Sequence, residues 1–245
     1  MSHGHYHLQC FDQPTNLAST AAHEWVAAVG VLSHDRQFNV ALSGGRITVP
    51  FLQEAAALFA KSPDYLNRLT VFWADERCVA PEHEDSNYAM FMEHFAIPTF
   101  LPEARIHRFK GEEEPEQAAQ KMASTLTELL PVNEDGVPVF DLVLLGMGED
   151  GHVASLFPEN MTEDLKRTGA YAFDVVASKL PPQRLTLSYQ VLQSARHVWA
   201  LISGEGKESA LSDSLKCQGH TPLAHVIQGR THTEIFTDFT LEAPV

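Results

Sequence analysis

The sequence predicts an α/β fold, namely a single Rossmann-like domain with a mainly parallel sheet covered by helices on both faces. Short, almost wholly apolar runs alternate along the chain with segments of helical spacing. Strands that are buried on both faces have this uninterrupted apolar character. The chain has 245 residues, 44% of them hydrophobic, and no repeat or linker divides it. One domain over residues 1–245 is therefore expected.

The predicted strands are apolar runs that end in turns rich in glycine or charge. They comprise residues 38–42, 69–74, 139–145 and 198–202, with further β-rich segments at 172–177 and 184–187. The predicted helices combine helical spacing with strong helix formers. They comprise residues 51–61, 113–130 (closed by Pro131) and 205–216.

Four of these strands end in turns that could carry chemistry. Parallel strands have their carboxyl ends at one edge of the sheet, where ligands of such folds bind. The four turns are therefore expected to lie together. They are Ser43-Gly44-Gly45, Asp75-Glu76-Arg77, Gly146-Met147-Gly148 and Ser203-Gly204-Glu205-Gly206.

The charge balance excludes some classes of partner. The chain has 17 Lys and Arg against 32 Asp and Glu, a net charge of −15. Such a chain has no overall attraction for nucleic acid or an anionic membrane surface. No apolar stretch approaches the ~20 residues of a membrane span. We expect neither nucleic acid nor membrane as a partner, so an anionic ligand would need local cations.

Cysteine usage and the N-terminal residues predict a cytoplasmic protein. The three cysteines are widely spaced and form no CxxC pair, so neither a disulfide framework nor a thiolate zinc site is indicated. The first residues lack the basic and apolar regions of a signal peptide. His3, His5 and His7 alternate, but no Asp, Glu or Cys nearby completes a ligand set. An edge strand or a frayed terminus is the better interpretation.

The Ser43-Gly44-Gly45 turn is suited to binding an anion. It precedes a predicted helix, and glycine lets the backbone approach a ligand while amides at a helix start point toward it. An ordinary strand-to-helix turn would have the same sequence. Residues 146–151 also match the dinucleotide pattern GxGxxG, but Glu149 and Asp150 would face the pyrophosphate and Pro158 leaves no room for a long helix. We therefore reject a dinucleotide site.

Asp150-Gly151-His152 is the candidate for acid–base chemistry. An imidazole can accept a proton from water near neutral pH, and a nearby carboxylate can orient the ring and stabilise its protonated form. A lone histidine in a loop is more often structural. His152 stands out because it follows the most apolar strand.

Three cations are expected at the same edge. Arg77 could bind a phosphate or stabilise an oxyanion, although an ion pair with Asp75 or Glu76 is the simpler interpretation. Lys207 follows two glycines, and Arg184 follows Pro181-Pro182. Between these cations, Asp85 is expected to cap a helix near Ser86-Asn87-Tyr88.

Taken together, the motifs resemble the 6-phosphogluconolactonase family. The resemblance covers most of the chain, from Leu42 to about Ala224, and its longest part is the run from Leu145 to Pro158. One departure lies after the glycine pair, where Arg46-Ile47-Thr48-Val49-Pro50 replaces a small residue and Thr-Pro. The matching segments, in family order, are Ser43-Gly44-Gly45, 72–79 (FWADERCV), Ser86-Asn87-Tyr88, 145–158 (LGMGEDGHVASLFP), 184–187 (RLTL) and 204–207 (GEGK).

The resemblance implies hydrolysis of 6-phosphogluconolactone to 6-phosphogluconate without metal or organic cofactor. Our hypothesis is that His152, steadied by Asp150, activates water for attack on the lactone. Glycine-turn amides or Arg77 would stabilise the oxyanion, and the role of Arg46 stays open. The other residues assigned to the substrate are Ser43, Gly44, Gly45, Asp75, Asn87, Gly146, Gly148, Arg184 and Lys207.

Two other functions are compatible with parts of this pattern. The amino-sugar-phosphate deaminases share the Gly-x-Gly-x-Asp-Gly-His turn, but they have a ring-opening Glu where this sequence has Phe157, and Asp-Glu-Tyr where it has Asp75-Glu76-Arg77. A non-catalytic sugar-phosphate sensor would not need both Asp150 and His152. A monomer or weak homodimer is expected.

Overall fold

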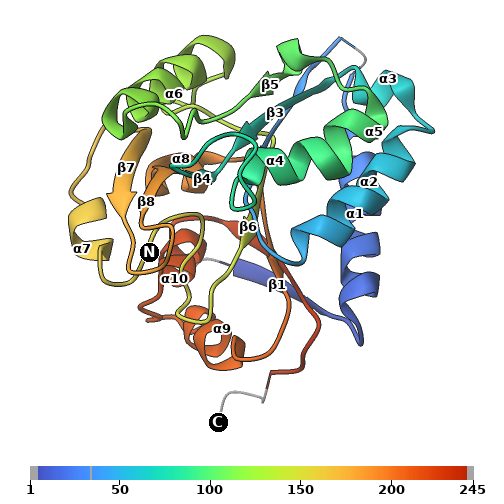
Figure 1. Cartoon of the computed structure of the whole chain (residues 1–245). Coiled ribbons are helices and arrows are strands. Elements are labelled where there is room, and N and C mark those ends of the chain that lie inside the picture. Colours follow the sequence, from blue (N-terminus) through green and yellow to red (C-terminus); the bar gives the residue numbers. More distant parts are fainter. Residues whose placement is uncertain (1–4, 34, 242–245) are drawn as a thin grey trace.

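The main sheet has seven parallel strands and confirms the predicted fold class. The computed structural model describes residues 5–33 and 35–241 (Figure 1). The strand order is β1-β10-β9-β6-β2-β3-β5, and every neighbouring pair is parallel. The strands are β1 (His5–Cys10), β2 (Phe38–Leu42), β3 (Leu69–Trp73), β5 (Ile106–His107), β6 (Leu142–Gly146), β9 (His197–Ile202) and β10 (His232–Thr237).

A second, antiparallel sheet of three strands lies beside the first. Its order is β4 (Asp75–Arg77), β8 (Gln183–Leu187) and β7 (Ala172–Val176). Residues 75–77 are thus a strand, and the prediction of a turn there was wrong. Their backbone groups pair with β8, more than a hundred residues later, and local sequence does not reveal such a partner.

Helices cover both faces of the main sheet. In Figure 1, α1 and α2 lie to the right of the sheet, while α6, α10 and the small sheet lie to its left. Trp25 of α1 stacks on Phe51 of α2, with ring centroids 5.5 Å apart, and joins the two helices. The α-helices are α1 (Pro14–Gly30), α2 (Thr48–Phe59), α3 (Pro63–Leu66), α4 (Asn87–Phe91), α5 (Ile97–Thr99), α6 (Pro115–Leu129), α7 (Met161–Asp164), α8 (Tyr189–Ser194), α9 (Glu208–Ser214) and α10 (Pro222–Gln228). A π-helical turn, Met92–Ala96, follows α4, and a 3₁₀ turn spans Glu103–Arg105.

The predicted element boundaries differ from the structure by a few residues. The helix expected over residues 51–61 runs from Thr48 to Phe59, and the strand expected from residue 139 begins at Leu142. Ser86, not Asp85, caps α4, because the Ser86 hydroxyl accepts a hydrogen bond from the Ala89 amide. The histidine-rich segment forms edge strand β1 from His5 onward, as predicted, whereas His3 lies outside the described residues.

The strand order reverses between β2 and β6. From β2 the chain adds β3 and β5 on one side, and from β6 it adds β9 and β10 on the other. Loops leaving the carboxyl ends of the two central strands therefore separate and open a crevice. The turns after these strands are Ser43-Gly44-Gly45 and Gly146-Met147-Gly148. The two glycine turns that the sequence predicts to bind a ligand therefore lie at the position where ligands bind in such folds.

None of the helices in residues 5–33 and 35–241 combines the length and the apolar character that a membrane crossing requires.

Candidate active site

The two glycine turns meet closely at the strand-order reversal. The Ser43 amide donates to the Leu144 carbonyl, which continues the β2–β6 ladder past the end of β2. A Cβ on Gly146 would lie 3.1 Å from the Gly44 carbonyl, and one on Gly44 would overlap the Asn87 side chain. Gly45 has a φ of +134°, which favours glycine. The Ser43 amide is therefore taken, and the amides at Gly44 and Gly45 are the ones that this turn could present.

Buried polar contacts connect this turn to the other loops of the site. Asn87 Nδ2 donates to the Asp75 carbonyl at 2.9 Å. Ser155 Oγ, which follows His152 in the chain, donates to Asp75 Oδ2 at 2.9 Å. Asp75, Asn87 and Ser155 are all at most 4% exposed. Asp75 thus connects its own segment to the segments of Asn87 and Ser155 through buried hydrogen bonds.

Glu76 organises the start of α4. Its carboxylate accepts hydrogen bonds from the amides of Arg77, Asn87 and Tyr88 and from Ser86 Oγ. Burial raises the pKa of Glu76 to about 7, against the lowering effect of those amides. The side chain is 2% exposed. A single carboxylate therefore fixes the loop that positions Arg77 and Asn87.

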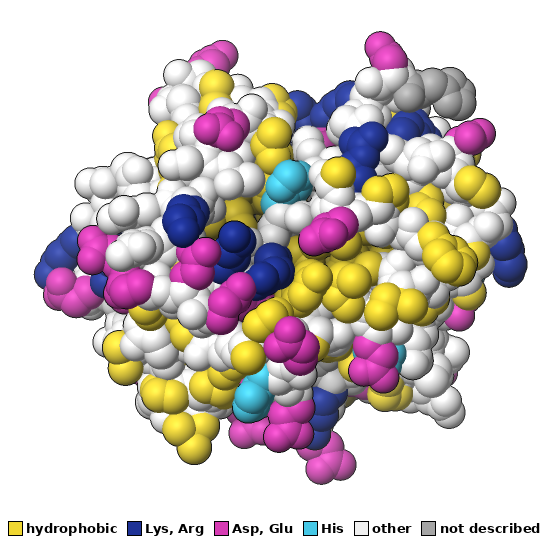
Figure 2. Space-filling model, turned by 45° about the horizontal axis from the view of Figure 1, so that its top comes forward, with side chains coloured by type: hydrophobic (Ala, Val, Ile, Leu, Met, Phe, Trp, Pro, Cys, Tyr) yellow, Lys and Arg dark blue, Asp and Glu magenta, His cyan; other side chains and the backbone are white. Residues whose placement is uncertain are grey.

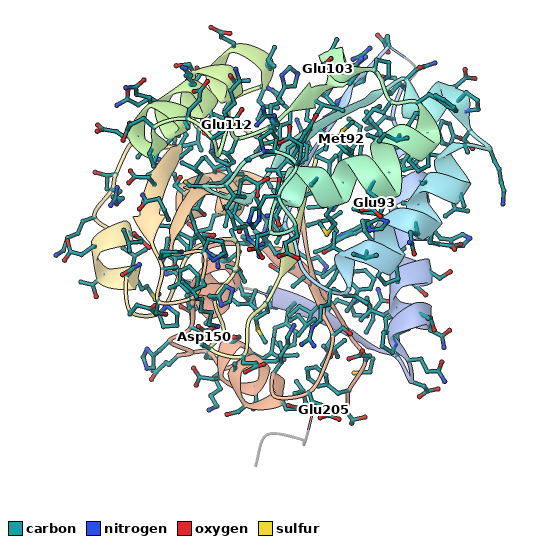
Figure 3. All side chains as sticks on the ribbon, in the orientation of Figure 1. Met92, Glu93, Glu103, Glu112, Asp150 and Glu205 are labelled. Carbon is teal, nitrogen blue, oxygen red and sulfur yellow. The ribbon has the colours of Figure 1, made fainter. Side chains whose placement is uncertain are left out.

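Asp150 and His152 are in contact, which their closeness in sequence alone did not establish. His152 Nδ1 lies 2.5 Å from Asp150 Oδ1, on the loop after β6 where Figure 3 labels Asp150. A Cβ on Gly148 would overlap the imidazole, so only glycine there leaves room for the ring. Phe157 packs against the other side of the imidazole with ring centroids 4.6 Å apart. Asp150, the backbone at Gly148 and Phe157 thus restrict the position of the imidazole ring.

The groups around Asp150 determine which atom of the Asp150–His152 contact carries the proton. Burial opposes ionisation of Asp150, but the hydrogen bond and charge of His152 and the bond from Lys179 outweigh it and hold the pKa of Asp150 well below its usual range. An ionised carboxylate only accepts hydrogen bonds. His152 Nδ1 therefore carries the proton of the short contact, which leaves Nε2 as the nitrogen able to accept one.

Arg77 and Arg184 are neighbours across the antiparallel β4–β8 pair. Arg77 Nη1 donates to the Asp85 carbonyl at 2.6 Å, so the ion pair with Asp75 or Glu76 considered from the sequence is not what holds its guanidinium. Arg184 is 5% exposed and donates to the carbonyls of Pro181 and Leu180. Burial and the charge of Arg77 lower the pKa of Arg184.

Lys207 belongs to a second group of cations. Burial lowers the pKa of Lys207, and the charges of Arg46 and Lys179 act in the same direction. Asp238 supports the glycine turn before Lys207, because it accepts hydrogen bonds from Ser203 Oγ at 2.6 Å and from the Gly204 amide at 3.2 Å. Asp238 was not predicted, and only the pairing of β9 with β10 brings it to this turn.

A cavity of about 500 Å³ opens beside the first glycine turn. Gly45, Arg46, Arg77 and Asn87 line it on one side, and a loop rich in acid and histidine lines the other. The space-filling view shows Lys and Arg side chains gathered next to a hydrophobic area, surrounded by Asp and Glu (Figure 2). Arg46 and Arg77 thus face this cavity together with four carboxylates, those of Glu82, Glu84, Asp85 and Glu93.

Two donors proposed from the sequence are already used within the loop. The Gly148 amide donates to the His152 carbonyl, and the Gly151 amide donates to the Gly148 carbonyl, both at 3.0 Å. These glycines shape the loop instead of offering amides to an oxyanion. Within the part of the chain that the structure describes, no group of three or more His, Cys, Asp or Glu side chains could hold a metal ion.

Comparison with known proteins identifies the family. The family model of glucosamine-6-phosphate isomerases/6-phosphogluconolactonase matches residues 12–235. Human 6-phosphogluconolactonase is 35% identical over 198 residues, which cover 80% of this chain and 75% of the human protein. A probable chloroplastic 6-phosphogluconolactonase 4 from Oryza sativa subsp. indica is 32% identical over 213 residues, which cover 84% of this chain and 65% of the rice protein. The matched part is therefore slightly less than two thirds of the rice relative.

Solved structures agree with this result. The devB protein is 28% identical with a TM-score of 0.83, over 96% of this chain and 97% of that chain. The 6-phosphogluconolactonase of Trypanosoma brucei is 25% identical with a TM-score of 0.84 over the same shares. The chain belongs to the glucosamine-6-phosphate isomerase/6-phosphogluconolactonase family.

The buried Glu76 predicts a measurable pH dependence of stability. Its carboxyl ionises near pH 4.5 in an unfolded chain and near 7 in the folded protein. Between these values the folded state binds more protons, so the free energy of unfolding contributed by this group falls as pH rises. Relative to Glu76→Gln, the wild type should lose up to about 3 kcal/mol between pH 5 and pH 8 in urea unfolding. Exposed Glu82→Gln is the control, and parallel pH dependence of wild type and Glu76→Gln would contradict the prediction.

Proposed function

We propose that this chain hydrolyses 6-phospho-D-glucono-1,5-lactone to 6-phosphogluconate, the second step of the oxidative pentose phosphate pathway. The observation that carries the proposal is the Asp150–His152 contact at the strand-order reversal, in a member of a family whose relatives include human 6-phosphogluconolactonase. A histidine whose Nε2 can accept a proton, on the loop next to the turn that Arg46 follows, provides the general base that hydrolysis of an anionic lactone needs.

In the proposed reaction, His152 Nε2 takes a proton from water while the water oxygen bonds to the lactone carbonyl carbon. The imidazolium that forms is stabilised by Asp150, whose Oδ1 already accepts from Nδ1. When the tetrahedral intermediate collapses, the bond between the carbonyl carbon and the ring oxygen breaks. The ring oxygen takes the proton back from His152, which leaves a neutral base and a carboxylic acid, and this acid releases its proton to solvent to give 6-phosphogluconate.

The phosphate is assigned to the first glycine turn. Gly45, Arg46 and Arg77 line one cavity, Gly44 directly precedes Gly45, and Lys207 lies near Arg46. Because Arg77 lines the same cavity as Gly45 and Arg46, we assign Arg77 to the phosphate rather than to the lactone carbonyl. Asn87 and Gly146 would shape this end of the site through their contacts with Gly44. Arg184 would act through the loop whose carbonyls it binds.

Phe157 argues against an amino-sugar-phosphate deaminase. The deaminases resembled by this sequence carry a carboxylate at that position, whereas Phe157 is fully buried against the His152 ring. No carboxylate from this position can therefore assist the opening of an aldose ring. Incubation with glucosamine 6-phosphate should release no ammonia, and its release would favour the deaminase.

The domain organisation, the partner and the compartment are inferred from the composition of the chain and from its hydrophobic core. We infer one domain over residues 1–245, because one hydrophobic cluster extends from α1 to β10. The net charge of −15 supports a small-molecule phosphorylated lactone, and not nucleic acid or membrane, as the partner of a monomer or weak homodimer. Three free cysteines support the reducing cytoplasm as the working compartment.

Replacement of the base tests the proposal directly. His152→Ala should lower kcat/KM for freshly generated lactone by about 10²- to 10⁴-fold after subtraction of spontaneous hydrolysis, because the general base is lost. Proton release measures the rate. The matched control is His23→Ala on the exposed face of α1, which should retain full activity. Equal turnover by wild type and His152→Ala would refute the assignment of the base.

Gly148→Ala tests the geometry of the same pair. The added Cβ would overlap the imidazole and displace it from Asp150, so kcat should fall by about 100-fold while binding of 6-phosphogluconate changes little. Gly136→Ala is the control: its Cβ meets no atom within 4 Å, and the strain at its φ of +78° should lower stability but leave kcat unchanged. A fully active Gly148→Ala enzyme would show that the observed position of the ring is not needed.

A further inference from the structure

The loop between β7 and β8 is fastened to the site from two directions. Ser178 Oγ donates to Glu159 Oε1 at 2.7 Å, which ties the loop to the segment after His152. On the carboxyl side of Lys179, the buried guanidinium of Arg184 donates through Nε to the Pro181 carbonyl at 2.9 Å and through Nη2 to the Leu180 carbonyl at 3.2 Å. These bonds fix the residue between the two anchors, Lys179.

Lys179 reaches the pair assigned to proton transfer. Its Nζ lies 3.0 Å from Asp150 Oδ2 and 3.4 Å from His152 Nδ1. Asp150 thus has one partner for each oxygen, with His152 on Oδ1 and Lys179 on Oδ2. No local pattern in the sequence distinguishes Lys179 from the other exposed lysines. Its place in the site arises only from the packing of the small sheet.

The two contacts of Lys179 have different physical characters. Toward Asp150 the ammonium is a hydrogen-bond donor and a counterion, which favours the ionised carboxylate. Toward His152 it cannot donate, because Nδ1 already carries the proton shared with Asp150. The remaining interaction is repulsion between the ammonium and a protonated imidazole, which favours the neutral ring.

The other charged groups around this pair are few. Glu159 interacts with Asp150, and Lys207, at the start of α9, interacts with Lys179. The apolar ring of Phe157 covers one side of the imidazole. Asp150 and Lys179 are therefore the charged side chains in direct contact with His152, and they act in opposite directions on its protonation.

We propose that Lys179 is a positioning residue that holds Asp150 against His152 and opposes protonation of the imidazole, so that the ring is available as a base. The proposal rests on the proposed role of His152. Asp150 alone would orient the ring and also favour its protonated, inactive form. Lys179 preserves the orientation and offsets that electrostatic effect. Arg184 contributes by holding the loop that presents Lys179.

The test compares Lys179→Met, which keeps the length and removes the charge, with wild type. The acidic limb of kcat/KM for the lactone should move to higher pH by at least about half a unit. At a pH well below the wild-type midpoint, a half-unit shift lowers kcat/KM by about threefold, with KM within about twofold of wild type. Lys179→Arg should restore most of the profile. The matched control is Lys166→Met, because Lys166 pairs only with Glu163 on the surface at 2.7 Å, and its profile should equal that of wild type.

A second measurement does not depend on turnover. NMR titration of the His152 ring, assigned by comparison with His152→Gln, should show proton on Nδ1 of the neutral ring, and a midpoint at higher pH in Lys179→Met. If wild type does not turn over the lactone, the proposed function fails while the titration still tests Lys179. A large rise in KM with the pH profile unmoved would overturn the proposal in favour of a substrate contact. Identical titrations of Lys179→Met and wild type would overturn it outright.

Discussion

The site depends on one short contact, the 2.5 Å approach of His152 Nδ1 to Asp150 Oδ1. The contact requires glycine at position 148, since any side chain there would occupy the volume of the imidazole. It also requires the loop after β6 to turn sharply, which Gly151 permits with a φ of +81°. The loop in turn rests on α10, where the Leu223 amide donates to the Gly151 carbonyl at 3.2 Å. The contact between Asp150 and His152 therefore depends on the backbone conformation of the loop after β6.

Buried polar side chains hold the remaining loops in register with this contact. The Asp75 carboxylate accepts a hydrogen bond from Ser155, which lies on the loop of His152. The Asp75 backbone carbonyl accepts one from Asn87, at the start of α4. Glu76 gathers the amides of that same helix start. Removing one partner from such a network leaves a buried polar group without compensation, which costs about 1–3 kcal/mol. The acidic residues next to Arg77 therefore serve the structure, while the cations around them supply the field for an anion.

Much of the site was predictable because its residues follow apolar strands directly. A strand such as β6, buried along nearly its whole length, predicts a parallel sheet, and parallel strands place the Ser43 and Gly146 turns at one edge. The adjacency of Asp150 and His152 needs only one tight turn. The small sheet was not predictable, because Asp75–Arg77 becomes a strand only by pairing with Gln183–Leu187. Lys179 and Asp238 enter the site through that sheet and through β10, and no local pattern in the sequence marks either residue.

We propose that the phosphate binds at the Gly44–Gly45 amides and that the reacting carbonyl lies at His152. A crystal structure with bound 6-phosphogluconate would show both positions. We expect phosphate oxygens within hydrogen-bonding distance, about 2.7–3.2 Å, of the Gly44 or Gly45 amide, and the C1 carboxylate at a similar distance from His152 Nε2. A phosphate bound away from this turn, or a carboxylate directed away from His152, would contradict this proposal.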